Sequence, residues 1–174
     1  MLKKYSNKLV ALHWMTVPLM ILSLGMGTFV LAEMPNNLEK INSLQVHMII
    51  GFVVGLLTLI RIFVKKNHQP LEPLKVENEA RKKLIKVTHF ALYTLILLMV
   101  ASGITLSILS GLGEIVFFGS SAPLPEDFSI YLPRKAHGIF AKVLFAFIGI
   151  HIVGVLLYKF KTDSSISKRM WFGK

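Results

Sequence analysis

The chain has 174 residues, of which 53% are hydrophobic and 17% are charged, and its formal net charge is +11. This apolar content excludes a disordered low-complexity protein. The lack of cysteine excludes disulfides, zinc–thiolate sites, iron–sulfur clusters and covalently attached haem. The basic residues stand between long apolar runs instead of covering a polar surface, so the positive charge does not indicate nucleic-acid binding.

Four apolar runs predict four membrane-spanning helices, at residues 9–31, 44–64, 84–109 and 136–160. Each run has about the 20 residues that a bilayer-crossing helix needs. The first run exceeds the apolar segment of about 7–15 residues that is typical of a signal peptide, so we expect it to be retained. The predicted fold is all-α: one integral membrane four-helix bundle over residues 1–174.

The segments between the runs read as connectors. Residues 67–83 include Pro70 and Pro73 and form a short cytoplasmic connector. Residues 110–135 include three prolines and three glycines and form the long outer loop, which is placed to cover a site. No strand pattern and no internal repeat is visible, so the four helices account for the predicted fold.

The distribution of basic residues predicts the orientation. Three precede residue 9, eight lie within 61–86 and five follow residue 158, whereas the other side has only Lys40, Arg134 and Lys135. Cytoplasmic loops carry the excess of Lys and Arg. We therefore expect a multi-pass protein of the bacterial inner membrane with both termini in the cytoplasm.

Five of the six histidines lie within the apolar runs, namely His13, His47, His89, His137 and His151. His68 is an expected exposed residue of the connector. Ionisable side chains are costly inside a membrane and therefore indicate function. By depth, His47 and His137 lie toward the outer face, and His13 and His151 lie toward the cytoplasm. Each pair is split between two helices.

The spacing within the fourth run is the sharpest signal. His137 and His151 are 14 residues apart, which is four helical turns less about 40°, so they share a face and lie about 21 Å apart. Histidines facing each other from two helices can supply both axial ligands of a haem. The small residues Gly138, Ala141 and Gly154 leave room for a flat macrocycle. Two histidine depths therefore predict two haem groups.

His89 leaves an alternative open, because it also lies near the cytoplasmic face. It could replace His13 as a ligand, or it could stay unligated and bind a haem propionate. A copper or zinc site is a weaker interpretation, since the histidines divide between two depths. A proton relay or transporter is weaker still, because the apolar runs contain no Asp or Glu.

These motifs together resemble the prokaryotic cytochrome b561 family of four-helix membrane proteins. The resemblance runs from Tyr5 to about Lys161. Its elements are Tyr5-Ser6, Leu12-His13-Trp14, His47, Arg61, Pro70 and Pro73, His89 with Tyr93, Ser102-Gly103, His137 and His151. Ala101 replaces the helix proline of the family, and the family's Trp and Glu beside the outer histidine are replaced by Ala136 and Gly138. The second departure concerns the electron donor and leaves the haem ligands unaffected.

The resemblance implies two b-type haems. It assigns His13 with His151 to the cytoplasmic-side haem and His47 with His137 to the outer haem, and both pairs would bind iron. His89 then becomes a residue that supports a ligand, and Arg61 belongs to the same cofactor-binding set. The resemblance further implies electron exchange with a quinone, with ubiquinone as the expected acceptor.

Three basic residues next to His137, namely Arg134, Lys135 and Lys142, are candidates for attracting an anionic donor or for neutralising haem propionates. We therefore expect superoxide oxidation at the outer face coupled to quinone reduction, with these three residues in the donor site. The alternative is an electron carrier, or a membrane-anchor subunit that links the quinone pool to a separate redox protein.

The orientation can be tested directly. A reporter that is active only in the cytoplasm should be active when fused after Lys174, and the same reporter inserted at Ser121 in the outer loop should be inactive, because the sixteen basic residues of one side hold that side in the cytoplasm. Periplasmic activity of a fusion after Lys174 would contradict the predicted orientation.

Overall fold

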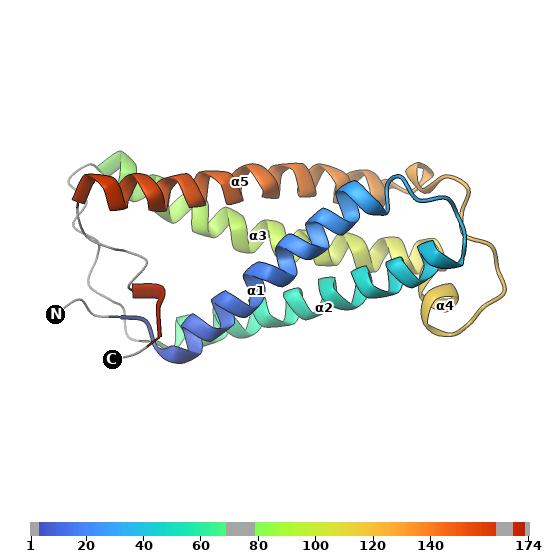
Figure 1. Ribbon diagram of the computed structural model, residues 1–174, viewed down its shortest axis with the longest axis horizontal. Coiled ribbons are helices and arrows are strands. Elements are labelled where there is room, and N and C mark those ends of the chain that lie inside the picture. Colours follow the sequence, from blue (N-terminus) through green and yellow to red (C-terminus); the bar gives the residue numbers. More distant parts are fainter. Residues whose placement is uncertain (1–3, 69–78, 163–168, 173–174) are drawn as a thin grey trace.

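The structure is a computed structural model that describes residues 4–68, 79–162 and 169–172. Pro70 and Pro73 of the expected connector lie outside the described residues, as do four of the basic residues that predict the orientation: Lys3, Lys75, Lys168 and Lys174. Figure 1 shows an elongated arrangement of long helices, and the described ranges contain no strand.

Four helices are long and apolar enough to cross a membrane. They are α1 (Asn7–Gly25) with its π-helical continuation η1 (Met26–Val30), α2 (Leu38–Lys66), α3 (Glu79–Leu109) and α5 (Leu132–Thr162). The expected class, an all-α bundle that spans a membrane, is confirmed by these helices.

The helices begin earlier than the apolar runs that predict them. The Asn37 side chain accepts a hydrogen bond from the Lys40 amide at 3.0 Å and caps α2 ahead of its apolar part. Pro133 lies in the first turn of α5, where a helix needs no amide donor. These first turns are polar, so an apolar run marks only the part of each helix that lies in hydrocarbon.

The outer segment 110–135 is not a plain loop, which corrects that expectation. It contains α4 (Leu112–Phe117) and the short 3₁₀ helix η2 (Phe128–Ile130). Gly111 has a φ of 69° in front of α4, a backbone conformation that favours glycine. The buried residues Leu112, Ile115, Val116 and Leu124 pack there against α2 and α3. The apolar side of α4 thus folds the segment back onto the bundle.

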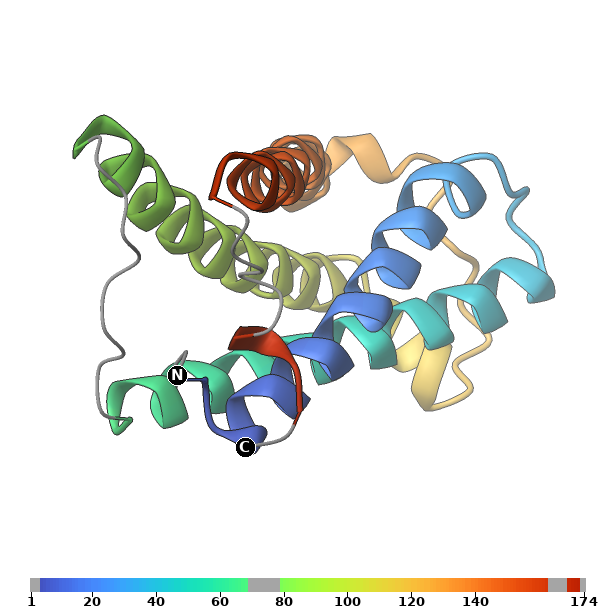
Figure 2. The same ribbon diagram turned by 60° about the vertical axis from the view of Figure 1, so that its left-hand side comes forward.

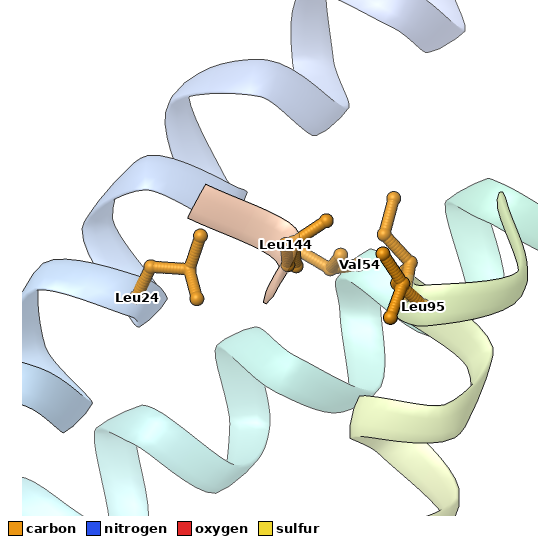
Figure 3. Close-up of a cluster of buried hydrophobic side chains, with 5 residues drawn as sticks. Leu24, Val54, Leu95 and Leu144 are labelled. Carbon is orange, nitrogen blue, oxygen red and sulfur yellow. The ribbon is translucent and has the colours of Figure 1, made fainter. Parts of the chain in front are cut away.

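The bundle consists of two closely packed helix pairs. α1 packs on α2, α3 packs on α5, and contacts of α2 with α3 join the two pairs. Halfway along, Leu24, Val54, Leu95, Ile96 and Leu144 form a buried apolar cluster (Figure 3). We call this cluster the central apolar layer, and it contains residues from all four long helices.

Most large apolar side chains point away from this layer. Phe29, Phe63, Phe90 and Phe160 are between 68% and 80% exposed. Apolar side chains this exposed on every long helix suit contact with lipid, since hydrocarbon solvates them as well as a protein core does. The structure therefore has the outward surface of a membrane protein.

The described terminal segments lie at the same end of the bundle. The Tyr5 amide donates a hydrogen bond to the Arg169 carbonyl at 3.1 Å, and the Trp14 indole donates one to the Met170 carbonyl at 2.7 Å. Figure 2 shows the C-terminal turn beside the first turns of α1. We call this end the inner end, and the end with α4 the outer end.

Candidate functional site

Two of the predicted histidines face each other near the outer end. The ring centres of His47 on α2 and His137 on α5 are 6.2 Å apart, and both rings line a cavity of about 1140 Å³. Two imidazoles on opposite sides of one metal, each at a bond length of about 2 Å, have ring centres about 6 Å apart. The spacing of the pair therefore suits two residues that would hold one haem iron, and the cavity is roomy for a bound cofactor.

Each of these rings is contacted by a serine, and the two serines come from the other two long helices. His137 Nδ1 lies 3.0 Å from the Ser102 hydroxyl on α3, and His47 Nδ1 lies 3.3 Å from the Ser23 hydroxyl on α1. In each ring Nδ1 is engaged, which leaves Nε2 as the nitrogen available to a metal. All four long helices thus take part in the outer pair.

Two glycines permit the close approach of helices to these rings. A Cβ atom at Gly27 would lie 3.0 Å from His47 Cε1, and one at Gly103 would lie 3.4 Å from His137 Cε1. Gly27 lies in the π-helical turn η1, a type of helix distortion that is frequent at functional sites. The space beside both imidazoles depends on residues without a side chain.

The three expected basic residues gather at the same cavity. Arg134, Lys135 and Lys142 line it together with Lys40. Glu126 and Asp127 of the outer segment also line it, and both are exposed. Hydrogen bonds from the Ser129 hydroxyl and amide lower the pKa of Asp127, which keeps its carboxylate charged. The cavity mouth therefore carries both signs of charge.

The other three histidines of the apolar runs gather at the inner end. The ring centres of His89 on α3 and His151 on α5 are 5.1 Å apart, and His13 lies in the first half of α1. His13 has its own ring contact with Trp14, at 5.3 Å. At the inner end the structure therefore pairs His151 with His89, whereas the family resemblance implies a pairing of His151 with His13.

Arg61 lies in this inner region, between helices. Its Nε donates a hydrogen bond to the Tyr93 hydroxyl at 3.0 Å, and its guanidinium also donates to the Leu9 carbonyl. Lys65 lies over the Tyr93 ring, 5.3 Å from its centre. His89 Nδ1 is 2.7 Å from the Ile85 carbonyl, so that nitrogen donates and Nε2 is free to accept or to bind a metal.

The two histidine groups lie at equal distances on either side of the central apolar layer. On α5 the central residue Leu144 follows His137 by seven positions and precedes His151 by seven. On α2 the central residue Val54 lies seven positions after His47 and seven before Arg61. Seven residues are close to two helical turns, so each histidine group lies about 10 Å from the central apolar layer.

The side chains available as metal ligands suit an iron that is already held by a macrocycle. Within residues 4–68, 79–162 and 169–172, no three or more His, Asp or Glu side chains come together as ligands for a bare metal ion. The described residues therefore offer no support for the copper or zinc alternative. A facing pair of imidazoles is what a haem needs from a protein.

Sequence reasoning missed the serine partners. Ser23 carries no sequence signal of its own, whereas Ser102 belongs to the Ser102-Gly103 element that the family resemblance includes. Reasoning from the sequence also missed the Arg61–Tyr93 contact, although it singled out both residues. In each case the partner is on another helix, and only the relative rotation of the helices brings the two together.

The comparisons with known proteins point to one family. The family model described as prokaryotic cytochrome b561 matches residues 4–173, which is nearly the whole chain. No curated protein matches the sequence. The match covers all four long helices and both histidine groups.

The contact at Gly27 yields a test of the outer pair. We expect Gly27→Val to push the His47 ring out of place, because its Cβ would lie 3.0 Å from that ring, and to lower the haem content of the purified protein. Gly25→Val is the matched control two positions earlier, where an added Cβ meets nothing within 4 Å. Equal haem absorbance in both variants would contradict the close approach.

Proposed function

The chain belongs to the prokaryotic cytochrome b561 family, and we propose that it is a di-haem member that oxidises superoxide at its outer end and reduces ubiquinone. Membership makes it a membrane protein for electron transfer with b-type haem. The observation that carries the proposal further is the His47–His137 pair, whose ring centres are 6.2 Å apart across a cavity.

In this proposal each of the two histidine groups, one at the outer end and one at the inner end, holds one haem. His47 and His137 are the axial ligands at the outer end, and His13 and His151 are the ligands at the inner end. His89 supports the inner site through its contact with His151 (5.1 Å between ring centres). Arg61 completes that site, since its guanidinium is a fixed positive charge suited to a propionate.

The inner assignment differs from the ring contacts of the structure. In the structure His151 has its ring contact with His89, and His13 has its ring contact with Trp14. To hold one haem with His151, the His13 ring would have to leave Trp14 and approach His151. His89 Nδ1 already donates to the Ile85 carbonyl, so its Nε2 can compete for the same position.

A haem with two imidazole ligands supplies one-electron transfer and leaves no coordination position open for oxygen. Superoxide gives up one electron and becomes O₂, and ubiquinone takes up two electrons and two protons to become ubiquinol. Two superoxide ions are therefore consumed for each ubiquinol formed. The residues at the outer cavity act by concentrating the anion, and the ligands act by holding the redox group.

Charge at the cavity supports an anionic donor. Arg134, Lys135 and Lys142 line the cavity with the outer histidines, and a focused positive potential raises the arrival rate of anions. The inner membrane is the proposed location, with both termini in the cytoplasm, because the described terminal segments share one end and most basic residues flank it.

The acidic residues at the same cavity favour a second candidate function. Glu126 and ionised Asp127 repel a small anion, and together with the lysines they form a surface of mixed charge that suits docking of a redox protein. In that case the chain is an electron carrier or membrane-anchor subunit between the quinone pool and that protein.

Haem content and ligand variants test the di-haem proposal. We expect the pyridine haemochrome assay to give about two haems per chain, from two pairs of axial ligands. His47→Ala and His137→Ala should each remove the same haem, because each leaves one axial position empty. His13→Ala and His151→Ala should remove the other.

His68→Ala is the control, since His68 lies beyond the end of α2 and outside the four spans; its side chain is half-buried, which corrects the expectation of an exposed residue. A single haem in the fully reconstituted protein would overturn the di-haem proposal. Loss of the inner haem in His89→Ala together with its retention in His13→Ala would move the ligand role from His13 to His89.

The salt dependence of haem reduction tests whether the electron donor is an anion attracted by the positive charge at the outer cavity. Focused positive charge raises association rates by roughly 10–10³-fold and is screened by ions. We therefore expect reduction by superoxide to slow as ionic strength rises, and to slow further in Lys135→Glu, as measured by stopped-flow absorbance.

Lys159→Glu provides the matched control, because it changes the net charge equally at the inner end of α5. Reduction by a neutral quinol should depend far less on salt in all three proteins. If superoxide fails to reduce the haems, the carrier or anchor function replaces the proposed one. If Lys135→Glu and Lys159→Glu behave alike, the donor does not use the cavity charge.

A further inference from the structure

The Ser102 hydroxyl on α3 contacts His137 on α5. Its Oγ donates a hydrogen bond to the Met99 carbonyl at 3.0 Å and lies 3.0 Å from His137 Nδ1. The hydroxyl has one proton, and the Met99 carbonyl takes it. With that proton donated to the Met99 carbonyl, the serine oxygen is left to accept from His137, an arrangement in which His137 carries its proton on Nδ1 and keeps the lone pair on Nε2.

Ser102 differs in this respect from other hydroxyls that bond to their own helix. Thr16, Thr58 and Thr105 each donate to the carbonyl four residues earlier, a habit of Ser and Thr in helices that needs no functional reason. Among the described residues, only Ser102 combines such a bond with a contact to a histidine of another helix. It is also buried, with 8% of its surface exposed.

Ser23 makes the corresponding contact with the opposite ring. Its Oγ lies 3.3 Å from His47 Nδ1, so it is the longer and weaker of the two. The two serines come from α1 and α3, whereas the two histidines come from α2 and α5. Each imidazole of the outer pair is therefore held from outside its own helix. At the inner end the Nδ1 of His89 bonds to a carbonyl of its own helix.

We propose that Ser102, and more weakly Ser23, are positioning residues that fix the tautomer of the outer histidine pair and set the reduction potential of the outer haem. This inference rests on the proposed ligation of that haem by His47 and His137. A hydrogen bond accepted from Nδ1–H raises the basicity of the ligand nitrogen and stabilises the oxidised iron. The serines therefore lower the potential of the outer haem relative to a ligand without this contact.

Redox titration of the purified holoprotein tests the proposal, since two haems give two one-electron components. We expect Ser102→Ala to raise the potential of one component by an amount equivalent to about a tenfold change in its equilibrium constant, or about 59 mV. Ser23→Ala should raise the same component by less, because its contact is longer. The low-spin electron paramagnetic resonance signal of that haem should shift in parallel.

The matched control is Thr105→Ala, which removes a hydroxyl bonded to its own helix three residues from Ser102 but without a histidine contact. It should leave both components unchanged. Ser102→Thr keeps the hydroxyl and should restore the wild-type potential. If Ser102→Ala loses the haem, retention in Ser102→Thr at the wild-type potential still supports the hydroxyl's role.

Three outcomes would overturn the inference: unchanged potentials in both serine variants, equal shifts of both components, or shifts of different components by Ser23→Ala and Ser102→Ala. A wild-type protein with one redox component would overturn the proposed di-haem function instead. The two failures are therefore distinguishable in the same titration.

Discussion

Imidazole rings inside a lipid-facing bundle need polar partners within the bundle, because hydrocarbon offers no hydrogen bonds. This constraint explains where the five histidines of the spans lie and which residues surround them. The outer pair has Ser23 and Ser102, and the inner group has a backbone carbonyl at Ile85 and a nearby arginine, Arg61. Each partner comes from the inside of the bundle, while exposed phenylalanines occupy the outside. The polar layers therefore determine which face of each helix points inward.

The central apolar layer follows from the same constraint. Between two groups of polar residues inside a membrane, a further polar side chain would find no hydrogen-bonding partner, so the residues there are apolar. Leu24, Val54 and Leu144 pack in this region with two residues of α3. The equal seven-residue steps from His137 to Leu144 and from Leu144 to His151 keep all three on nearly the same face of α5. One helix thereby supplies a histidine to each end of the bundle and a packing residue between them.

Hydropathy and helical spacing predict the four spans and the depth of each histidine, and the family resemblance adds the pairing of His47 with His137. It could not predict α4, because Leu112–Phe117 is too short a run to show a helical period and its burial depends on partners in α2 and α3. The spacing of the residues also could not decide which two of His13, His89 and His151 bind the inner haem in the proposed function. Spacing along one helix defines a face, but the rotation of α1 and α3 about their axes depends on packing. The serine contacts were missed for the same reason, since both join residues on different helices.

The distribution of ionisable groups constrains what can pass between the two layers. The spans contain no Asp or Glu beyond their first turns, and between Ser102 and Tyr93 on α3 or between His47 and Arg61 on α2 every residue is uncharged. Lys142 belongs to the outer cavity. The stretches of α2 and α3 that cross the central apolar layer thus carry no charged side chain, and electron transfer needs none. Under the proposed function, the protons of ubiquinol must then enter at the end where ubiquinone is reduced. The inner end, with Arg61, Tyr93 and His89 close to the described termini, has the polar groups for that exchange.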